Sequence, residues 1–274
     1  MRHRKLMPIS EGIADLLLKI ASAENVSEQK LAETLLRLNL MNRKTKLYQI
    51  SCTAALVQGV LHGGIASSHI LENGDFGLGT FENLDGEMAI LDGQIYQMCA
   101  DGTVKQRSDR FDVPFAQVCR FGSFETYSLA GVRDFSDLAR EASACRASNN
   151  HFYAFLIEAY FDTMHVRAVK PSQPGTSLAS AAENETIFTW NGISGCLIGF
   201  WSPEFSSSFS VPGYHFHFLS ADRTKGGHVL DCSFEHAKLR VHFLSELSVS
   251  FPTSGPFLEA DLSADTREAL RKAE

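Results

Sequence analysis

Three of the ten histidines in the chain lie close together in the segment GYHFHFLSADRTKGGHVLD, residues 213–231. His215 and His217 are separated by one phenylalanine, and His228 follows a run of turn-forming residues. On a β-strand, residues two apart point to the same face, so His215 and His217 share a face if this segment is extended. A hairpin turn through ADRTKGG would bring His228 beside His217 on the next strand. The spacing therefore predicts three imidazoles that converge on one face of a sheet.

Three neutral imidazoles that leave one position open are typical of a catalytic zinc site, although Fe²⁺, Ni²⁺, Cu²⁺ and Mn²⁺ also accept nitrogen ligands. The alternative is that each histidine is held separately by its own hydrogen bonds. A cupin iron site also begins with two histidines one residue apart. It then requires a glutamate four or five residues later, where this chain has Ala221 and Asp222. The pattern therefore favours a metal site, and its match to a cupin is poor.

The overall composition indicates a water-soluble globular protein. The chain has 274 residues with 44% hydrophobic residues and a formal net charge of −7. A chain of this length buries enough surface for a core without disulfide bonds. The negative charge disfavours a nucleic acid or an anionic membrane as partner, since both attract an excess of Lys and Arg. We therefore expect a cytoplasmic protein that has no nucleic-acid or membrane partner.

Neither a membrane segment nor a disulfide framework is predicted. The apolar residues near the N-terminus are interrupted by Glu11, Asp15 and Lys19, so they form no signal-peptide core. The six cysteines contain no C-x-x-C pair and have irregular spacings, which predicts free thiols that pack as small hydrophobic groups.

Helical and extended patterns divide the chain. Residues 11–41 have the periodicity of two helices, the second of which begins with Ser27 as a candidate N-cap. From residue 45 onward short strands and helices alternate, and Asp92-Gly93 marks a hairpin turn. These patterns predict an α+β fold with antiparallel or mixed sheets, preceded by a helical N-terminal segment.

Further along the chain, the sequence predicts a helix over 135–148 capped by Asp134 or Ser136. Residues 151–170 have the pattern of two strands joined near Asp162-Thr163, and residues 213–247 that of three strands. A proline- and glycine-containing stretch follows residue 170 and suggests a boundary. We expect a helical extension over 1–44, a β-rich half over 45–175, and a second β-rich half over 176–274 that carries the histidines.

Three segments together resemble the alpha-acetolactate decarboxylase family. They are GDFGLGTFENLDGEMAILDG at 74–93, VRAVKPSQP at 166–174 and the histidine segment at 213–231. The resemblance runs from about Leu47 to the C-terminus and leaves residues 1–40 outside. It implies an α+β subunit with two similar β-rich halves, a homodimer, and conversion of 2-acetolactate to acetoin and CO₂. It also implies a zinc ion.

The resemblance assigns the site residues one by one. It implies that zinc is held by the histidines at 215, 217 and 228. It further implies active-site roles for Thr80 in GLGTF, Glu87 in LDGE, Arg167 in HVRAVK and Glu274 at the end of LRKAE. Glu259 and Glu268 are alternatives to Glu274.

These residue types suit a decarboxylation. Loss of CO₂ leaves an electron pair that the adjacent ketone can accept, forming an enediolate. A zinc ion chelated by the 2-hydroxyl and ketone oxygens would stabilise that charge. Arg167 would bind and orient the carboxylate through its planar fork. Glu87 or Glu274 would then donate a proton, and Thr80 would position a water or a substrate oxygen.

Two other classes of function stay open from the sequence alone. One is a cupin-like metal-dependent oxygenase or isomerase, which would contain iron and consume O₂. The other is a non-catalytic binding module stabilised by zinc, which would have four protein ligands and a basic surface.

Overall fold

The computed structural model describes residues 10–23, 25–42, 45–122, 124–173, 175–253, 255–263 and 268–270. The chain divides into two compact units, residues 1–43 and residues 44–274. The predicted division of the second unit at residue 175 stays a prediction. It falls in the connection between strands β10 and β11, which are neighbours in one sheet.

The first unit is a pair of helices, α1 (Glu11–Ala23) and α2 (Glu28–Asn42). The Ser27 hydroxyl accepts a hydrogen bond from the backbone N–H of Lys30 at 3.2 Å, so the predicted N-cap is present. Ala21 is buried, whereas Leu16 and Leu36 are each 57% exposed. The helical N-terminal segment expected from the periodicity is confirmed.

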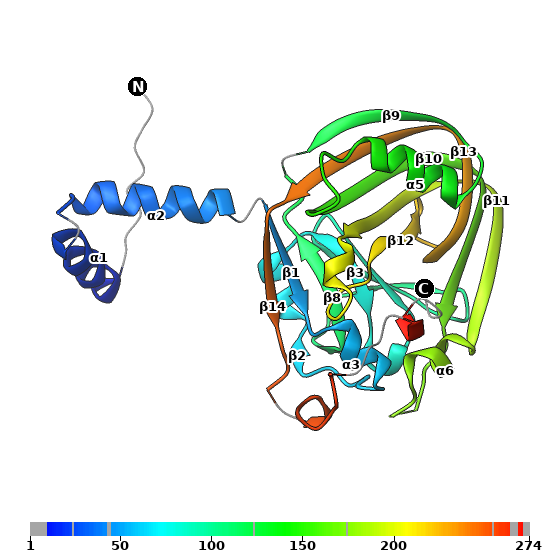
Figure 1. The fold of residues 1–274 in the computed structure, drawn as a ribbon, viewed down its shortest axis with the longest axis horizontal. Coiled ribbons are helices and arrows are strands. Elements are labelled where there is room, and N and C mark those ends of the chain that lie inside the picture. The colour runs from blue at the N-terminus through cyan, green and yellow to red at the C-terminus, as the bar shows by residue number, and fades with distance from the viewer. Residues whose placement is uncertain are drawn as a thin grey trace. The chain divides into compact units, whose positions relative to one another are not determined.

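The second unit contains a seven-stranded sheet in the order β14-β1-β8-β3-β4-β5-β6 (Figure 1). Strand β1 is parallel to β14 and antiparallel to β8, so this sheet is mixed, as expected. Its strands are β1 (Lys46–Ile50), β3 (Phe76–Thr80), β4 (Glu87–Leu91), β5 (Gln94–Met98), β6 (Val104–Arg107), β8 (Phe115–Cys119) and β14 (Glu246–Ser250). The Asp92-Gly93 turn joins β4 to β5, and both residues have positive φ, 52° and 73°, as a tight hairpin requires.

A five-stranded antiparallel sheet has the order β10-β11-β12-β13-β9. Strand β10 pairs with both β11 and β13, so the long strands curl around into a partly closed sheet (Figure 1). Its strands are β9 (Glu125–Val132), β10 (Phe152–Val169), β11 (Glu185–Ser202), β12 (Gly213–Ser220) and β13 (Gly226–Leu244). The short strands β2 (Ile65–Ala66) and β7 (Asp112–Val113) form a separate pair.

Short helices complete the second unit. They are α3 (Thr53–Val57), α4 (Ser68–Asn73), α5 (Phe135–Ala144) and α6 (Leu178–Ala182), with 3₁₀ turns at η1 (Glu82–Leu84), η2 (Glu204–Ser206) and η3 (Gly255–Leu258). At the tail, residues 268–270 are helical, and the rest of the predicted terminal helix lies outside the described residues.

Alternation along β12 sends its side chains into two different cores. Phe216 and Phe218 belong to a cluster that also contains Leu138 of α5. Leu219 belongs instead to the cluster between the two sheets. His215 and His217 have the same parity as Leu219 and therefore face the other sheet. The predicted arrangement, with histidines on one face and phenylalanines on the other, is confirmed.

Two strand predictions were wrong. Residues 152–169 form one strand, not two, and residues 226–244 are also continuous. In β10, however, the side-chain parity changes near Asp162. Phe161 packs in the cluster that contains Leu138 of α5. Further along the strand the residues in this cluster are the even-numbered Met164 and Val166. Because of this change, Arg167 points away from α5, to the side opposite to Val166. If the alternation had continued regularly from Phe161, Arg167 would point toward α5.

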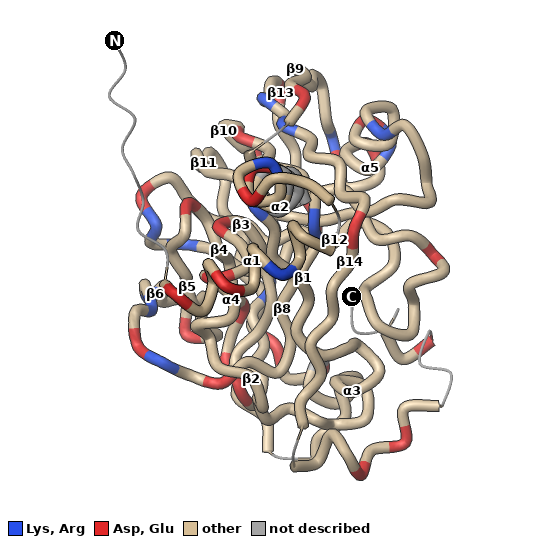
Figure 2. The backbone as a smooth tube through the Cα atoms, turned by 90° about the vertical axis from the view of Figure 1, so that its left-hand side faces the viewer, with Lys and Arg blue, Asp and Glu red and all other residues tan. Residues whose placement is uncertain are grey.

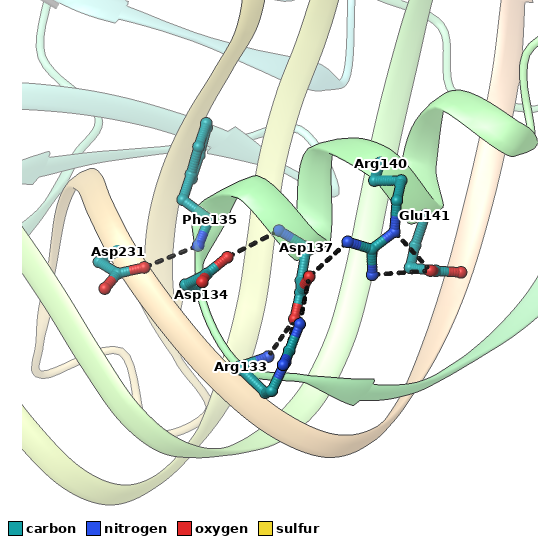
Figure 3. A network of polar contacts seen from close by, with 7 residues as sticks. All are labelled: Arg133, Asp134, Phe135, Asp137, Arg140, Glu141 and Asp231. Carbon is teal, nitrogen blue, oxygen red and sulfur yellow. Dashed lines mark hydrogen bonds and ion pairs between the residues drawn. The ribbon is translucent and has the colours of Figure 1, made fainter.

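Helix α5 is fixed at its first turn to the strand that carries His228. Asp134 caps the helix by accepting from the Asp137 N–H at 2.8 Å, and Asp231 of β13 accepts from the Phe135 N–H at 2.7 Å (Figure 3). Asp137 forms ion pairs with Arg133 and Arg140. This network anchors the helix that covers the phenylalanine face of β12.

The free-thiol prediction is confirmed. All six cysteines are free thiols. Within the part of the chain that the structure describes, no helix is long and apolar enough to cross a membrane. Lys and Arg are interspersed with Asp and Glu along the described backbone (Figure 2).

Candidate metal and substrate site

The three histidines converge as predicted. His217 lies directly opposite His228 in the register of β12 and β13. The Nε2 atom of His215 is 3.2 Å from Nε2 of His217 and 3.2 Å from Nδ1 of His228. All three side chains are buried, and together they form a group that could hold a metal ion.

The spacing of these nitrogen atoms suits a small divalent cation. Bonds of about 2.0–2.1 Å to a tetrahedral zinc place two nitrogen ligands roughly 3.3 Å apart. The Nδ1 atom of His217 donates to the carbonyl oxygen of Met88 at 2.7 Å, which leaves the Nε2 lone pair directed at the other two rings. Hydrogen bonds of this kind orient ligands in metal sites.

The electrostatics keep two of the rings neutral, as metal binding requires. Burial, with a smaller contribution from the nearby positive charge of Arg167, lowers the pKa of His215 to about 3. Burial likewise lowers the pKa of His217 well below its ordinary value, with His215 and Arg167 adding smaller effects. The arrangement therefore fits a metal ion.

Glu87 and Thr80 enter the site from the other sheet. They pair with each other across β3 and β4, at the end of that hairpin nearest the histidines. The Oε2 atom of Glu87 is 3.5 Å from Nε2 of His217. The Thr80 hydroxyl donates to the carbonyl oxygen of Gly86 at 3.0 Å, which leaves its own lone pairs available as acceptors.

Arg167 is a buried residue of the site and not a surface ion pair. It lies opposite His228 in the register of β10 and β13 and is 8% exposed. Its guanidinium donates to Oε2 of Glu185 on β11 at 3.2 Å. A Cβ atom at Gly227 would lie 2.6 Å from the Arg167 carbonyl oxygen, so a glycine before His228 permits this close strand contact.

These groups line a small cavity of about 60 Å³. Its polar lining comprises Thr53, Thr80, Glu87, Arg167, His215 and His228. The rest of its wall is mainly apolar: Leu56, Leu84, Phe115, Val169, Leu178, Val211 and Leu270. The structure thus brings together every predicted site residue that it describes, and His217 completes the histidine group beside this cavity.

A larger groove of about 670 Å³ lies next to the cavity and shares His228, Val211 and Leu270 with it. Glu268 lines this groove. Glu274 lies outside the described residues, so its place is not given.

The apolar wall of the small cavity was not predicted from the sequence, because its leucines come from separate helices and loops and have no common spacing.

The cupin comparison is not supported by the local geometry. Asp222, one of the two residues at the position where a cupin glutamate would stand, accepts hydrogen bonds from the Ser220 hydroxyl and the Thr224 N–H. It is part of the turn between β12 and β13. Among the described residues, the group of mutually close ligand atoms comprises the three histidines, and the Glu87 carboxylate lies 3.5 Å from His217.

Polar and titratable groups that converge on a small apolar cavity, beside three histidines able to hold a metal, are characteristic of an enzyme active site. Residues 47–264 match the family model of Alpha-acetolactate decarboxylase. The chain therefore belongs to the alpha-acetolactate decarboxylase family, and the expectation that it is an enzyme of this family is confirmed.

Individual relatives support this assignment. An alpha-acetolactate decarboxylase from Methanosarcina mazei is 37% identical over 234 residues, which cover 85% of this chain and 81% of the relative. One from Lactococcus lactis subsp. cremoris is 33% identical over 233 residues, covering 85% and 98%. The crystal structure of alpha-acetolactate decarboxylase from Bacillus subtilis strain 168 superposes with a TM-score of 0.81 at 29% identity, covering 84% of this chain and 99% of that chain.

Proposed function

We propose that this protein decarboxylates 2-acetolactate to acetoin and CO₂ with a zinc ion held by His215, His217 and His228. The observation that carries the proposal is the pair of 3.2 Å contacts that His215 Nε2 makes with the other two rings, inside a site that also contains Arg167 and Glu87. Family membership supports the reaction. When bound, zinc would supply a Lewis acid that stabilises the negative charge developing on the substrate oxygens.

Arg167 binds the substrate carboxylate in this proposal. Its guanidinium is held by its hydrogen bond to Glu185 and lies in the cavity wall with His215 and His228, where a planar fork suits a carboxylate. A fixed fork holds the carboxylate so that the breaking C–C bond is aligned with the adjacent ketone. Because the site is largely buried, this interaction is stronger than it would be in water.

The proton that completes acetoin comes from a carboxyl group. Glu87 is one candidate, because its position 3.5 Å from His217 places it at the histidine group. The other comes from the C-terminal tail. In the tail, the family resemblance favours Glu274 as the proton donor. Glu268 is favoured by its position in the lining of the larger groove. Thr80 positions a water or a substrate oxygen through the lone pairs of its hydroxyl.

The test is metal analysis joined to an acetoin assay on the purified protein with racemic 2-acetolactate. We expect about one zinc per chain and acetoin formation without O₂ consumption. Bound iron with O₂ consumption would replace the proposal with a cupin-like oxygenase. Bound zinc without turnover would replace it with a zinc-stabilised binding module.

The setting of the enzyme is also part of the proposal. We expect a cytoplasmic homodimer that has no nucleic-acid or membrane partner. The net charge of −7 and the interspersed charges of Figure 2 support the last point. Light scattering on the purified protein tests the dimer, since a monomeric mass would contradict it.

A further inference from the structure

The loop between Thr80 and Glu87 has an unusual backbone. Asn83 and Leu84 both have φ near 58°, in the left-handed region. Asparagine tolerates this region, but leucine rarely adopts it because its Cβ crowds the following carbonyl. Backbone strain of this kind persists only where the surrounding structure imposes it, and it is concentrated at functional sites.

Hydrogen bonds on both sides impose the conformation. The N–H of Asn83 donates to the Leu61 carbonyl at 2.9 Å, and the Asn83 carbonyl accepts from the Ser172 N–H at 2.7 Å. The Leu84 N–H donates to the Phe81 carbonyl at 2.9 Å, and the Leu84 carbonyl accepts from the Gly86 N–H at 2.7 Å. Both peptide groups are therefore held in place.

The next two residues are anchored as well. The Asp85 carbonyl accepts from the Gln97 side chain at 2.6 Å, and the Gly86 carbonyl accepts from the Thr80 hydroxyl at 3.0 Å. The loop is thus fixed to β3, to β5 and to the segment after β10. The result is that one leucine side chain, 4% exposed, lines the cavity that contains Arg167 and the histidines.

The cavity has a polar wall and an apolar wall, and 2-acetolactate has the same division. If its carboxylate, hydroxyl and ketone oxygens engage the polar wall, the alkyl group on C2 must face the apolar one. The cavity is small, about 60 Å³, and Leu84 forms part of its apolar wall. Leu84 lies in the segment that joins Thr80 to Glu87 and lines the same cavity as these two residues.

We propose that the left-handed conformation of Leu84 places its side chain against the C2 alkyl group of the substrate and makes Leu84 a determinant of specificity. It favours a methyl group at C2 over an ethyl group. This inference rests on the proposed function, since it assumes that 2-acetolactate is the substrate.

The test compares Leu84→Ala and Leu84→Gly in the zinc-loaded enzyme. The measured quantity is kcat/KM for 2-aceto-2-hydroxybutyrate divided by kcat/KM for 2-acetolactate. Both variants open the wall, so we expect this ratio to rise about tenfold or more, the usual effect of one methylene in an apolar pocket. Only glycine also relieves the left-handed backbone, so Leu84→Gly should have the higher melting temperature of the two.

The matched control is Leu61→Ala. Leu61 is buried in the same apolar cluster as Leu84 but does not line the cavity. The Leu61→Ala substitution should lower the melting temperature. It should leave the ratio of the two kcat/KM values within about twofold of the wild-type ratio, since one methylene of pocket contact changes such a ratio by about tenfold. A ratio that rises equally in Leu61→Ala would show that loosened packing, not the Leu84 side chain, sets the preference.

If the Leu84 variants react too slowly, binding replaces turnover. The probes are 2-hydroxy-2-methylpropanoate and 2-hydroxy-2-methylbutanoate, which lack the ketone and differ by one methylene. The Kd ratio should shift towards the larger acid in both variants. An unchanged ratio in a folded, zinc-loaded variant would overturn the inference. A wild-type enzyme that decarboxylates neither substrate would instead refute the proposed function.

Discussion

The Nδ1 atom of His217 donates a hydrogen bond to the carbonyl oxygen of Met88 across 2.7 Å. His217 belongs to the five-stranded sheet, and Met88 belongs to the seven-stranded sheet, next to Glu87. The contact therefore fixes one histidine ring of the candidate metal site against the strand that carries a candidate proton donor. The orientation of the ring and the position of Glu87 depend on the packing of the two sheets.

His217→Ala should lose zinc and activity together. The substitution removes one of three nitrogen atoms and also the contact to Met88 that orients the ring. Zinc content by mass spectrometry and acetoin formation measure the result. The control is His236→Ala, an exposed histidine of β13 outside the group, which should keep both. One equivalent of tightly bound zinc with full turnover in His217→Ala would refute the metal assignment.

Arg167→Lys should lower turnover by about two orders of magnitude or more, while the zinc content stays unchanged. Lysine keeps the charge but loses the planar fork, and a misplaced catalytic group costs roughly this much. The measurement is kcat with 2-acetolactate. Arg240→Lys is the control, because Arg240 forms an ion pair with Glu158 in the same sheet but away from the cavity. An unaltered rate in Arg167→Lys would reduce Arg167 to a structural ion pair.

Glu268→Gln should slow decarboxylation strongly, because Glu268 lines the groove that shares His228 with the cavity. A neutral amide keeps the shape of the side chain but cannot donate the carboxyl proton. Zinc content and melting temperature should stay nearly unchanged. Deletion of Glu274 provides the comparison. Full activity in Glu268→Gln with loss in the deletion would return the role to Glu274, as the resemblance first implied.

Asp137→Asn should lower the melting temperature at pH 7, and the difference should shrink as the pH falls below 4. Hydrogen bonds from Arg133 and Arg140 hold the pKa of Asp137 well below its ordinary value of 3.8. A carboxylate with a lowered folded-state pKa stabilises the fold above its unfolded-state pKa and loses that contribution as pH falls through the folded value. Thermal unfolding of both proteins at pH 7 and pH 3 measures this, and a difference independent of pH would contradict it.

Much of the candidate site could be predicted from the amino-acid sequence. Strict alternation in GYHFHFL places His215 and His217 on one face, because the side chains of a strand have a period of two residues. The turn composition that follows returns the chain antiparallel, which puts His228 beside His217. The Asp92-Gly93 turn and the Asp134 N-cap could also be predicted from the sequence, since both depend on local backbone conformation and hydrogen bonding.

Only the tertiary structure decided the rest. The side of the sheet to which Arg167 points depends on the change in side-chain alternation near Asp162 in β10. The pattern of apolar and polar residues in this segment does not predict that change. The contact between His217 and Met88 joins the two sheets through residues that are 129 positions apart in the sequence. The left-handed conformation of Leu84 is imposed by partners as distant as Ser172. A local pattern fixes periodicity and turns, whereas the relative placement of two sheets depends on how their apolar faces pack together.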